Sequence, residues 1–104
     1  MMMPDFDRFL RLLEQKKFFE AHEALEEYWF PRRFEEKNEV KLLKGLINAA
    51  VSFELIQRGR IKQSKKVWMN YLKYRQLLYK IDTPFYNEIH RCIREIDRLR
   101  RVYM

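Results

Sequence analysis

Glycine and proline are scarce along this chain, and their scarcity limits what it can fold into. The 104 residues include two glycines and three prolines. Because tight turns depend on these two residue types, few places remain where the chain can reverse direction, and long helices are favoured. No segment shows the alternating apolar pattern of a half-buried strand. The sequence therefore predicts an all-α fold, a compact five-helix antiparallel bundle or helical-hairpin array.

The spacing of apolar residues predicts where these helices lie. Apolar side chains recur every three or four residues, which is the period of a helix face packed on a core. Asp5 is placed to cap the first helix, and Gly59 is placed to end the third in a left-handed conformation. The predicted helices cover about residues 5–14, 17–30, 35–58, 61–81 and 84–102. Residues 1–104 are expected to form a single helical domain.

The third predicted helix, about residues 35–58, is expected to lie at the centre of the bundle. Its apolar side chains occupy more than half of its circumference, and a helix of this kind is surrounded by others. Gly45, Ala49 and Ala50 are small enough for a neighbouring helix to approach closely. Gly45 costs about 1 kcal/mol of helix propensity relative to alanine, and close packing explains why it is tolerated.

The cysteine content and the N-terminal segment indicate a cytoplasmic protein. Cys92 is the one cysteine, so no internal disulfide can form, which fits a reducing compartment. The first residues lack the apolar run of an export signal. The longest mainly apolar stretch, residues 46–56, is too short to span a bilayer. We expect no membrane association.

A histidine and a glutamate one helical turn apart form the most prominent polar cluster. His22 and Glu26 lie between an apolar stripe and an acidic stripe of the second predicted helix. The imidazole should be partly buried, with one nitrogen in reach of Glu26 and the other directed toward a neighbouring helix. Asn48 or Glu54 of the third helix could meet it, and both remain open. The apolar residues on the same face are Phe18, Leu25 and Trp29.

This cluster has two interpretations. In the first, His22 and Glu26 form a satisfied hydrogen-bonded pair that fixes how two helices dock. In the second, they belong to a metal or acid–base site, which needs a third ligand such as Glu23 or Glu54. We predict no metal and no cofactor, and no catalytic residue can be named. The pocket candidates are His22, Glu23, Glu26, Trp29, Asn48 and Glu54; if a metal binds, His22 and Glu26 are its first candidates.

Charge is distributed unevenly along the chain. Residues 1–40 contain seven Lys/Arg and ten Asp/Glu, a net charge of −3, whereas residues 41–104 contain fifteen and five, a net of +10. No acidic residue occurs between Leu55 and Ile81. The anion-binding candidates share one sector of the fourth predicted helix: Lys62, Lys65, Lys66, Lys73 and Lys80. The fifth helix adds Arg91, Arg94, Arg98, Arg100 and Arg101.

Such a lysine stripe is typical of a solvated surface, and an anionic partner can also use it. The candidate partners are nucleic acid, an acidic protein or a polyphosphate. No helix-turn-helix signature, zinc knuckle or RNA-binding strand motif accompanies the charge. The stripe therefore indicates anion binding without naming a ligand.

Three segments of the chain resemble a known family. They are the run Ala-His-Glu-Ala-Leu-Glu-Glu-Tyr-Trp at residues 21–29, the run Gly-Leu-Ile-Asn-Ala-Ala at 45–50, and Arg58-Gly59. Their order and spacing resemble domain-of-unknown-function family 309 of bacteria and archaea. The resemblance covers about residues 18–78 and implies a compact all-α protein without an established activity. The chain departs from the family pattern at Asn48, usually glutamine, and at Arg60, usually asparagine.

The sequence favours a noncatalytic cytoplasmic binding module. Its His22/Glu26 cluster would organise the fold or a small pocket, and its basic fourth and fifth helices would form the interaction surface. One alternative is a metal-dependent hydrolase that uses His22, Glu23, Glu26 and Glu54. The other is nonspecific nucleic-acid binding through the basic helices. Both a monomer and a homodimer are compatible with the sequence.

Overall fold

A computed structural model describes residues 3–103, and every regular element within this range is helical. The α-helices are α1 (Phe6–Glu14), α2 (Phe18–Trp29), α3 (Asn38–Gln57), α4 (Ile61–Arg75) and α5 (Tyr86–Tyr103). Two 3₁₀ turns extend α2 and α4: η1 (Phe30–Arg32) and η2 (Gln76–Lys80). The predicted all-α fold is confirmed. No helix in the described range is both long enough and apolar enough to cross a membrane.

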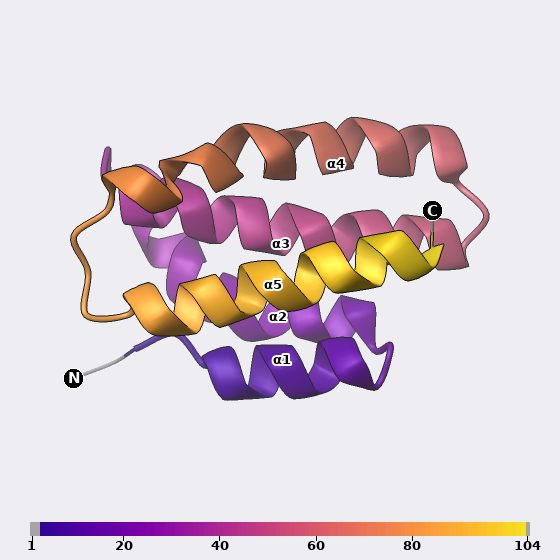
Figure 1. The fold of residues 1–104 in the computed structure, drawn as a ribbon, viewed down its shortest axis with the longest axis horizontal. Helices are drawn as coiled ribbons and strands as arrows, with labels where there is room; N and C mark the ends of the chain where they lie inside the picture. Colours follow the sequence, from indigo (N-terminus) through magenta and orange to yellow (C-terminus); the bar gives the residue numbers. More distant parts are fainter. Residues whose placement is uncertain (1–2, 104) are drawn as a thin grey trace.

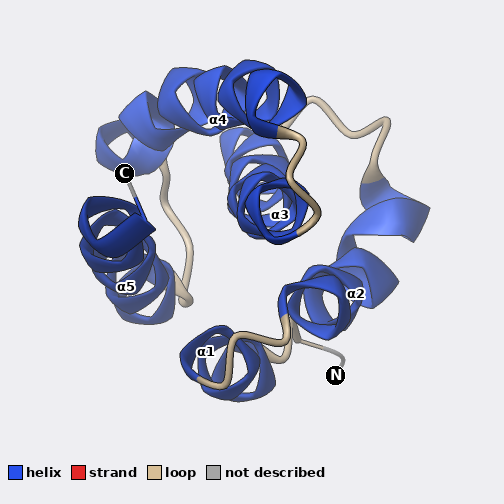
Figure 2. Ribbon diagram, turned by 90° about the vertical axis from the view of Figure 1, so that its right-hand side faces the viewer, coloured by secondary structure: helices blue, strands red, loops and turns tan. Residues whose placement is uncertain are grey.

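Consecutive helices run in opposite directions and form an antiparallel bundle (Figure 1). Seen end-on, α1, α2, α4 and α5 are arranged around the central α3, and α5 closes the bundle against α1 (Figure 2). Because the five helices alternate in direction, α1 and α5 point the same way where they meet. The N-terminal and C-terminal helices of the chain therefore lie side by side.

The helix ends follow local capping, with three differences from the predicted bounds. The Asp5 side chain accepts a hydrogen bond from the Arg8 backbone N–H at 3.1 Å, and Gly59 ends α3 with a φ of 76°, both as predicted. α3 begins at Asn38 rather than 35, because Lys37 has an extended ψ of 138°. The last turn predicted for the fourth helix is the 3₁₀ turn η2. α5 begins at Tyr86, because residues 83–85 form a turn closed by the Thr83 hydroxyl.

α3 lies at the centre of the bundle, as predicted. Half of its residues are buried, and it contacts α2, α4 and α5. Gly45 faces Tyr74, which lies just before the end of α4. A Cβ placed on Gly45 would lie only 2.8 Å from the Tyr74 Cβ, closer than side chains normally approach. Glycine at this position is therefore what allows α3 and α4 to pack at this distance.

An aromatic cluster connects α3 to three other helices. Phe53 of α3 is fully buried. Its ring centroid lies 5.2 Å from that of Phe18 in α2, 5.9 Å from Trp68 in α4 and 5.8 Å from Tyr103 in α5. These distances fall within the range of favourable aromatic pairs. Phe53 therefore joins four helices at one point of the core.

Candidate functional site

His22 and Glu26 lie in contact on α2. The i,i+4 spacing places both side chains on one side of the helix, where His22 Nε2 and Glu26 Oε2 form an ion pair or hydrogen bond. The His22 side chain is 20% exposed and that of Glu26 is 42% exposed. The Phe19 ring meets the imidazole edge-on, with the centroids 5.8 Å apart. The pair thus lies at the margin of the core.

The second imidazole nitrogen has a different environment from the first. His22 Nδ1 is buried and has no hydrogen-bond partner among the described protein groups. The expected polar contact between this nitrogen and a neighbouring helix is therefore not formed. The pair satisfies one ring nitrogen and leaves the other without a protein partner.

Asn48 and Glu54 of α3, the two candidate partners of His22, form their polar contacts with other residues. The Asn48 side-chain amide donates to the Lys44 carbonyl oxygen at 2.7 Å, within its own helix. The Glu54 carboxylate, 14% exposed, forms an ion pair at 2.8 Å with Nη2 of Arg58, the residue that follows the end of α3. Arg58 was missed as a partner of Glu54, although the i,i+4 spacing is visible in the sequence. Each side chain is satisfied without His22.

The remaining candidates near His22 do not complete a ligand set. Glu23 is exposed and Trp29 is half-buried, with its ring against that of Phe30. Within residues 3–103, no three His, Cys, Asp or Glu side chains lie close enough together to hold a metal ion. Of the four residues in the hydrolase hypothesis, the structure brings His22 and Glu26 into contact.

Replacing His22 by alanine is expected to lower the free energy of unfolding by about 1 kcal/mol or less. Because Glu26 remains 42% exposed, water can solvate the carboxylate that loses its partner. Urea denaturation of the wild type and of the variant measures the difference. A loss of about 3 kcal/mol, the upper range for stranding a buried polar group, would contradict this assignment.

The five lysines predicted to bind anions are all exposed. Lys62, Lys65, Lys66 and Lys73 lie on α4, and Lys80 ends η2. None of them forms an ion pair with a residue in the described part of the chain. Met69, 61% exposed, lies among them. The outer side of α4 is therefore a positive surface that the protein itself does not neutralise.

Between α4 and α5 lies a polar network that the sequence analysis missed. The buried Tyr71 hydroxyl donates to Asp97 Oδ1 at 2.8 Å, and Arg75 Nη1 donates to both Asp97 oxygens at 3.1 and 3.2 Å. Burial, and then the nearby Asp97 carboxylate, raise the pKa of the Tyr71 hydroxyl well above its ordinary value. The one sequence signal was Asp97 itself, an acid that follows Glu95 among the arginines of the fifth helix.

Arg100 differs from the other arginines of α5 because it points inward. Its guanidinium lies over the Trp68 ring, 4.5 Å from the centroid, and Nη1 is buried without a hydrogen-bond partner in the described range. Desolvation lowers the pKa of the Arg100 guanidinium. Arg100 is therefore partly buried between α4 and α5, whereas Arg91, Arg94, Arg98 and Arg101 are exposed. Its cation–π contact helps to hold α5 against α4.

Comparison with known proteins identifies the family. A family model described as a domain of unknown function (DUF309) matches residues 6–67, more than half of the chain. The match begins at α1 and ends within α4, so it includes His22, Glu26 and all of α3. No curated protein and no solved structure matches the chain. By the extent of the family match, the chain belongs to the DUF309 family, which is defined by this domain of unknown function.

Proposed function

We propose that this protein is a noncatalytic binding module that holds an anionic macromolecule on the outer side of α4. The observation that carries this proposal is the exposure of all five lysines without an ion-pair partner in the described chain. The segment between Leu55 and Ile81 also contains no acidic residue. A positive surface of this kind attracts polyanions over distances of about a Debye length, roughly 8–10 Å.

The geometry of α4 suits contact with several negative charges in a row. Lys62, Lys66 and Lys73 follow one another at spacings of four and seven residues, which is about 6 and 10 Å along the helix axis. Their mobile ammonium groups act as point charges and place no demand on the orientation of the partner. Met69 offers apolar contact between them. These features support sequence-independent contact with a backbone of repeated anionic groups.

The His22/Glu26 pair enters the proposal as a structural element of α2. His22 and Glu26 are engaged with each other, Asn48 bonds to Lys44 within α3, and Glu54 pairs with Arg58 at the end of α3. A pair engaged within one helix at the core margin supports a local structural role in α2.

The test is the salt dependence of binding to a labelled single-stranded oligonucleotide, with polyglutamate as a second probe. We expect binding to weaken steeply as salt rises from about 50 to 200 mM. We also test a triple variant with Lys62→Gln, Lys66→Gln and Lys73→Gln. Each phosphate contact contributes about 0.7 to the magnitude of the slope of log K against log salt, so the loss of three contacts should reduce that magnitude by about 2.

The matched control changes the same number of charges elsewhere. Lys16→Gln, Lys17→Gln and Lys37→Gln, all exposed and outside α4, should leave the slope close to that of the wild type. Equal weakening in both triple variants would mean that net charge alone causes binding, and would refute a site on α4. Tighter binding of polyglutamate than of the oligonucleotide would identify an acidic protein as the partner.

A further inference from the structure

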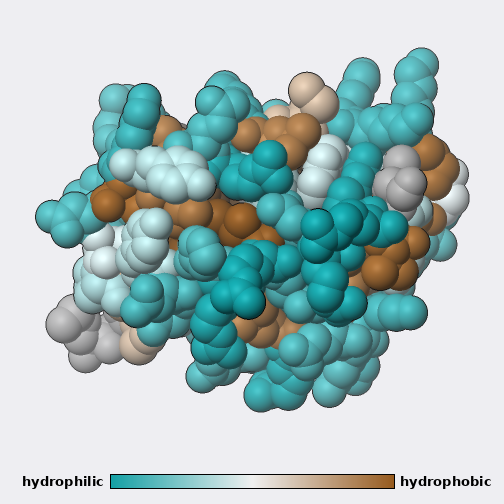
Figure 3. All heavy atoms as spheres, viewed as in Figure 1, coloured by the Kyte–Doolittle hydropathy of each residue, from teal (hydrophilic) through white to brown (hydrophobic). Residues whose placement is uncertain are grey.

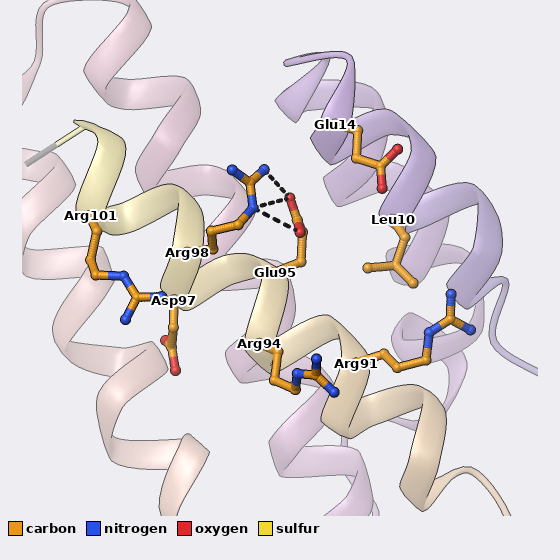
Figure 4. Close-up of a pocket in the computed structure, with 8 residues that line it drawn as sticks. All are labelled: Leu10, Glu14, Arg91, Arg94, Glu95, Asp97, Arg98 and Arg101. Carbon is orange, nitrogen blue, oxygen red and sulfur yellow. Dashed lines mark hydrogen bonds and ion pairs between the residues drawn. The ribbon is translucent and has the colours of Figure 1, made fainter.

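A second basic feature, separate from the α4 lysines, is a groove between α1 and α5 (Figure 4). It has a volume of about 660 Å³. The most hydrophilic surface of the face shown in Figure 3 crosses the middle of the molecule, where α5 runs. The groove is lined by Leu10 and Glu14 of α1 and by four arginines of α5: Arg91, Arg94, Arg98 and Arg101.

Two acidic residues of α5 also line the groove, and each is already engaged. Glu95 holds Arg98 through three contacts, from Nε to both carboxylate oxygens at 3.2 Å and from Nη2 to Oε1 at 2.5 Å. Asp97 accepts from Tyr71 and Arg75, as described above. Neither carboxylate therefore neutralises the remaining arginines of the groove.

The charges left without a partner determine which ligand fits. Arg91, Arg94 and Arg101 form no hydrogen bond or ion pair with any residue in the described range, and neither does the Glu14 carboxylate. Arg91 and Arg94, one turn apart, give a local charge of +2, whereas Arg101 lies about 15 Å farther along the helix from Arg91. A phosphate monoester carries a charge of about −1.5 to −2 at pH 7, whereas a carboxylate or a phosphodiester carries −1. The monoester is the ligand that matches the groove.

We propose that the groove binds a phosphate monoester, with Arg91 and Arg94 as its principal contacts. These residues are one helical turn apart, and both side chains extend on the groove side of α5 (Figure 4). The planar guanidinium fork donates two parallel hydrogen bonds to a phosphate, a geometry that lysine cannot offer. A groove of 660 Å³ also has room for an organic group bonded to the phosphate.

The backbone that carries these arginines is held firmly. On its inner side α5 buries Ile93, Ile96 and Leu99, so the helix cannot rotate without exposing them. The Glu95–Arg98 pair fixes one wall of the groove before a ligand arrives. A site whose groups are already in place loses less conformational entropy on binding.

The test is an NMR titration of the full chain with phenyl phosphate at pH 7.5, with benzenesulfonate as the monoanionic control. We expect phenyl phosphate to shift the side-chain Nε–H resonances of Arg91 and Arg94 and to bind at least about tenfold more tightly than benzenesulfonate. The double variant Arg91→Gln, Arg94→Gln should weaken binding at least about tenfold, because the loss of even one charge-assisted hydrogen bond has an effect of this size. Equal affinity for the two anions, or an unchanged affinity in this variant, overturns the proposal.

Two further measurements make the test specific. The double variant Lys62→Gln, Lys66→Gln should bind phenyl phosphate as the wild type does, so failure of the α4 proposal and failure of this one are distinguishable. A glycine-flanked phosphoserine peptide distinguishes the source of the phosphate. Tighter binding of the peptide supports a phosphorylated protein as the ligand, and tighter binding of phenyl phosphate supports a small metabolite. Equal binding of the phosphorylated and unphosphorylated peptides, together with no binding of phenyl phosphate, refutes the site.

Discussion

Replacing Phe53 by alanine is expected to lower the free energy of unfolding by about 3–5 kcal/mol. The ring is fully buried and contacts aromatic side chains from α2, α4 and α5, so its removal leaves a cavity where four helices meet. A domain of this size is stabilised by only about 5–15 kcal/mol, so the loss is a large share of the total. Urea denaturation measures it, and the melting temperature should fall by about 15 °C or more.

Phe34→Ala is the matched control for this substitution. The Phe34 side chain is 83% exposed and lies outside the core, so the same change in residue type should alter stability by no more than about 0.5 kcal/mol. If Phe53→Ala cost as little as Phe34→Ala, the core around α3 would not be packed as described. The comparison separates the effect of burial from the effect of losing a phenyl group.

The fold was predictable because its determinants are local. Helical spacing of apolar residues, the Asp5 cap and the left-handed Gly59 each act within a few residues, and the structure confirms them. The width of the apolar arc on α3 was enough to place this helix at the centre. The exact starts of α3 and α5 were not predicted: Lys37 is extended rather than helical, and the Thr83 hydroxyl closes a turn before α5.

The polar contacts were less predictable than the fold, because only some of them are local. The His22–Glu26 and Glu54–Arg58 pairs follow the i,i+4 rule, and only the first was recognised. The Tyr71–Asp97 hydrogen bond joins residues 26 positions apart, and helical periodicity does not indicate which residues of two helices meet. The groove between α1 and α5 was not predictable for the same reason. It exists only because α5 packs against α1, two helices from opposite ends of the sequence.

Raising the pH above 9 is expected to destabilise the protein, because two buried groups hold their protons in the folded state. Burial raises the pKa of the Cys92 thiol from 9.0 to about 12. Burial and Asp97 raise that of the Tyr71 hydroxyl above its ordinary value of 10.0. In the unfolded chain both groups lose their protons near these ordinary values, so above them the unfolded state binds fewer protons and the free energy of unfolding falls.

The stabilising contribution of both groups is fully present below pH 9. The free energy of unfolding should then fall by about 1.4 kcal/mol per pH unit through Cys92, and by about the same again above pH 10 through Tyr71, a total of about 4 kcal/mol at pH 11. Urea denaturation in a reducing buffer at pH 8, 9, 10 and 11 measures this decline, which should be about one such step from pH 9 to 10 and about two from pH 10 to 11.

Substitutions at the two positions assign the decline to its sources. Cys92→Ala should be less stable at neutral pH, because it leaves a small cavity, yet its stability should change little between pH 9 and 10. Tyr71→Phe should keep the decline that begins at pH 9 and lose the added decline above pH 10. Tyr79→Phe, at a site that is 85% exposed, should follow the wild-type curve throughout. If Cys92→Ala kept the full decline from pH 9, the thiol would not be its source, and the closed core that holds Cys92 away from water would have to be open in solution.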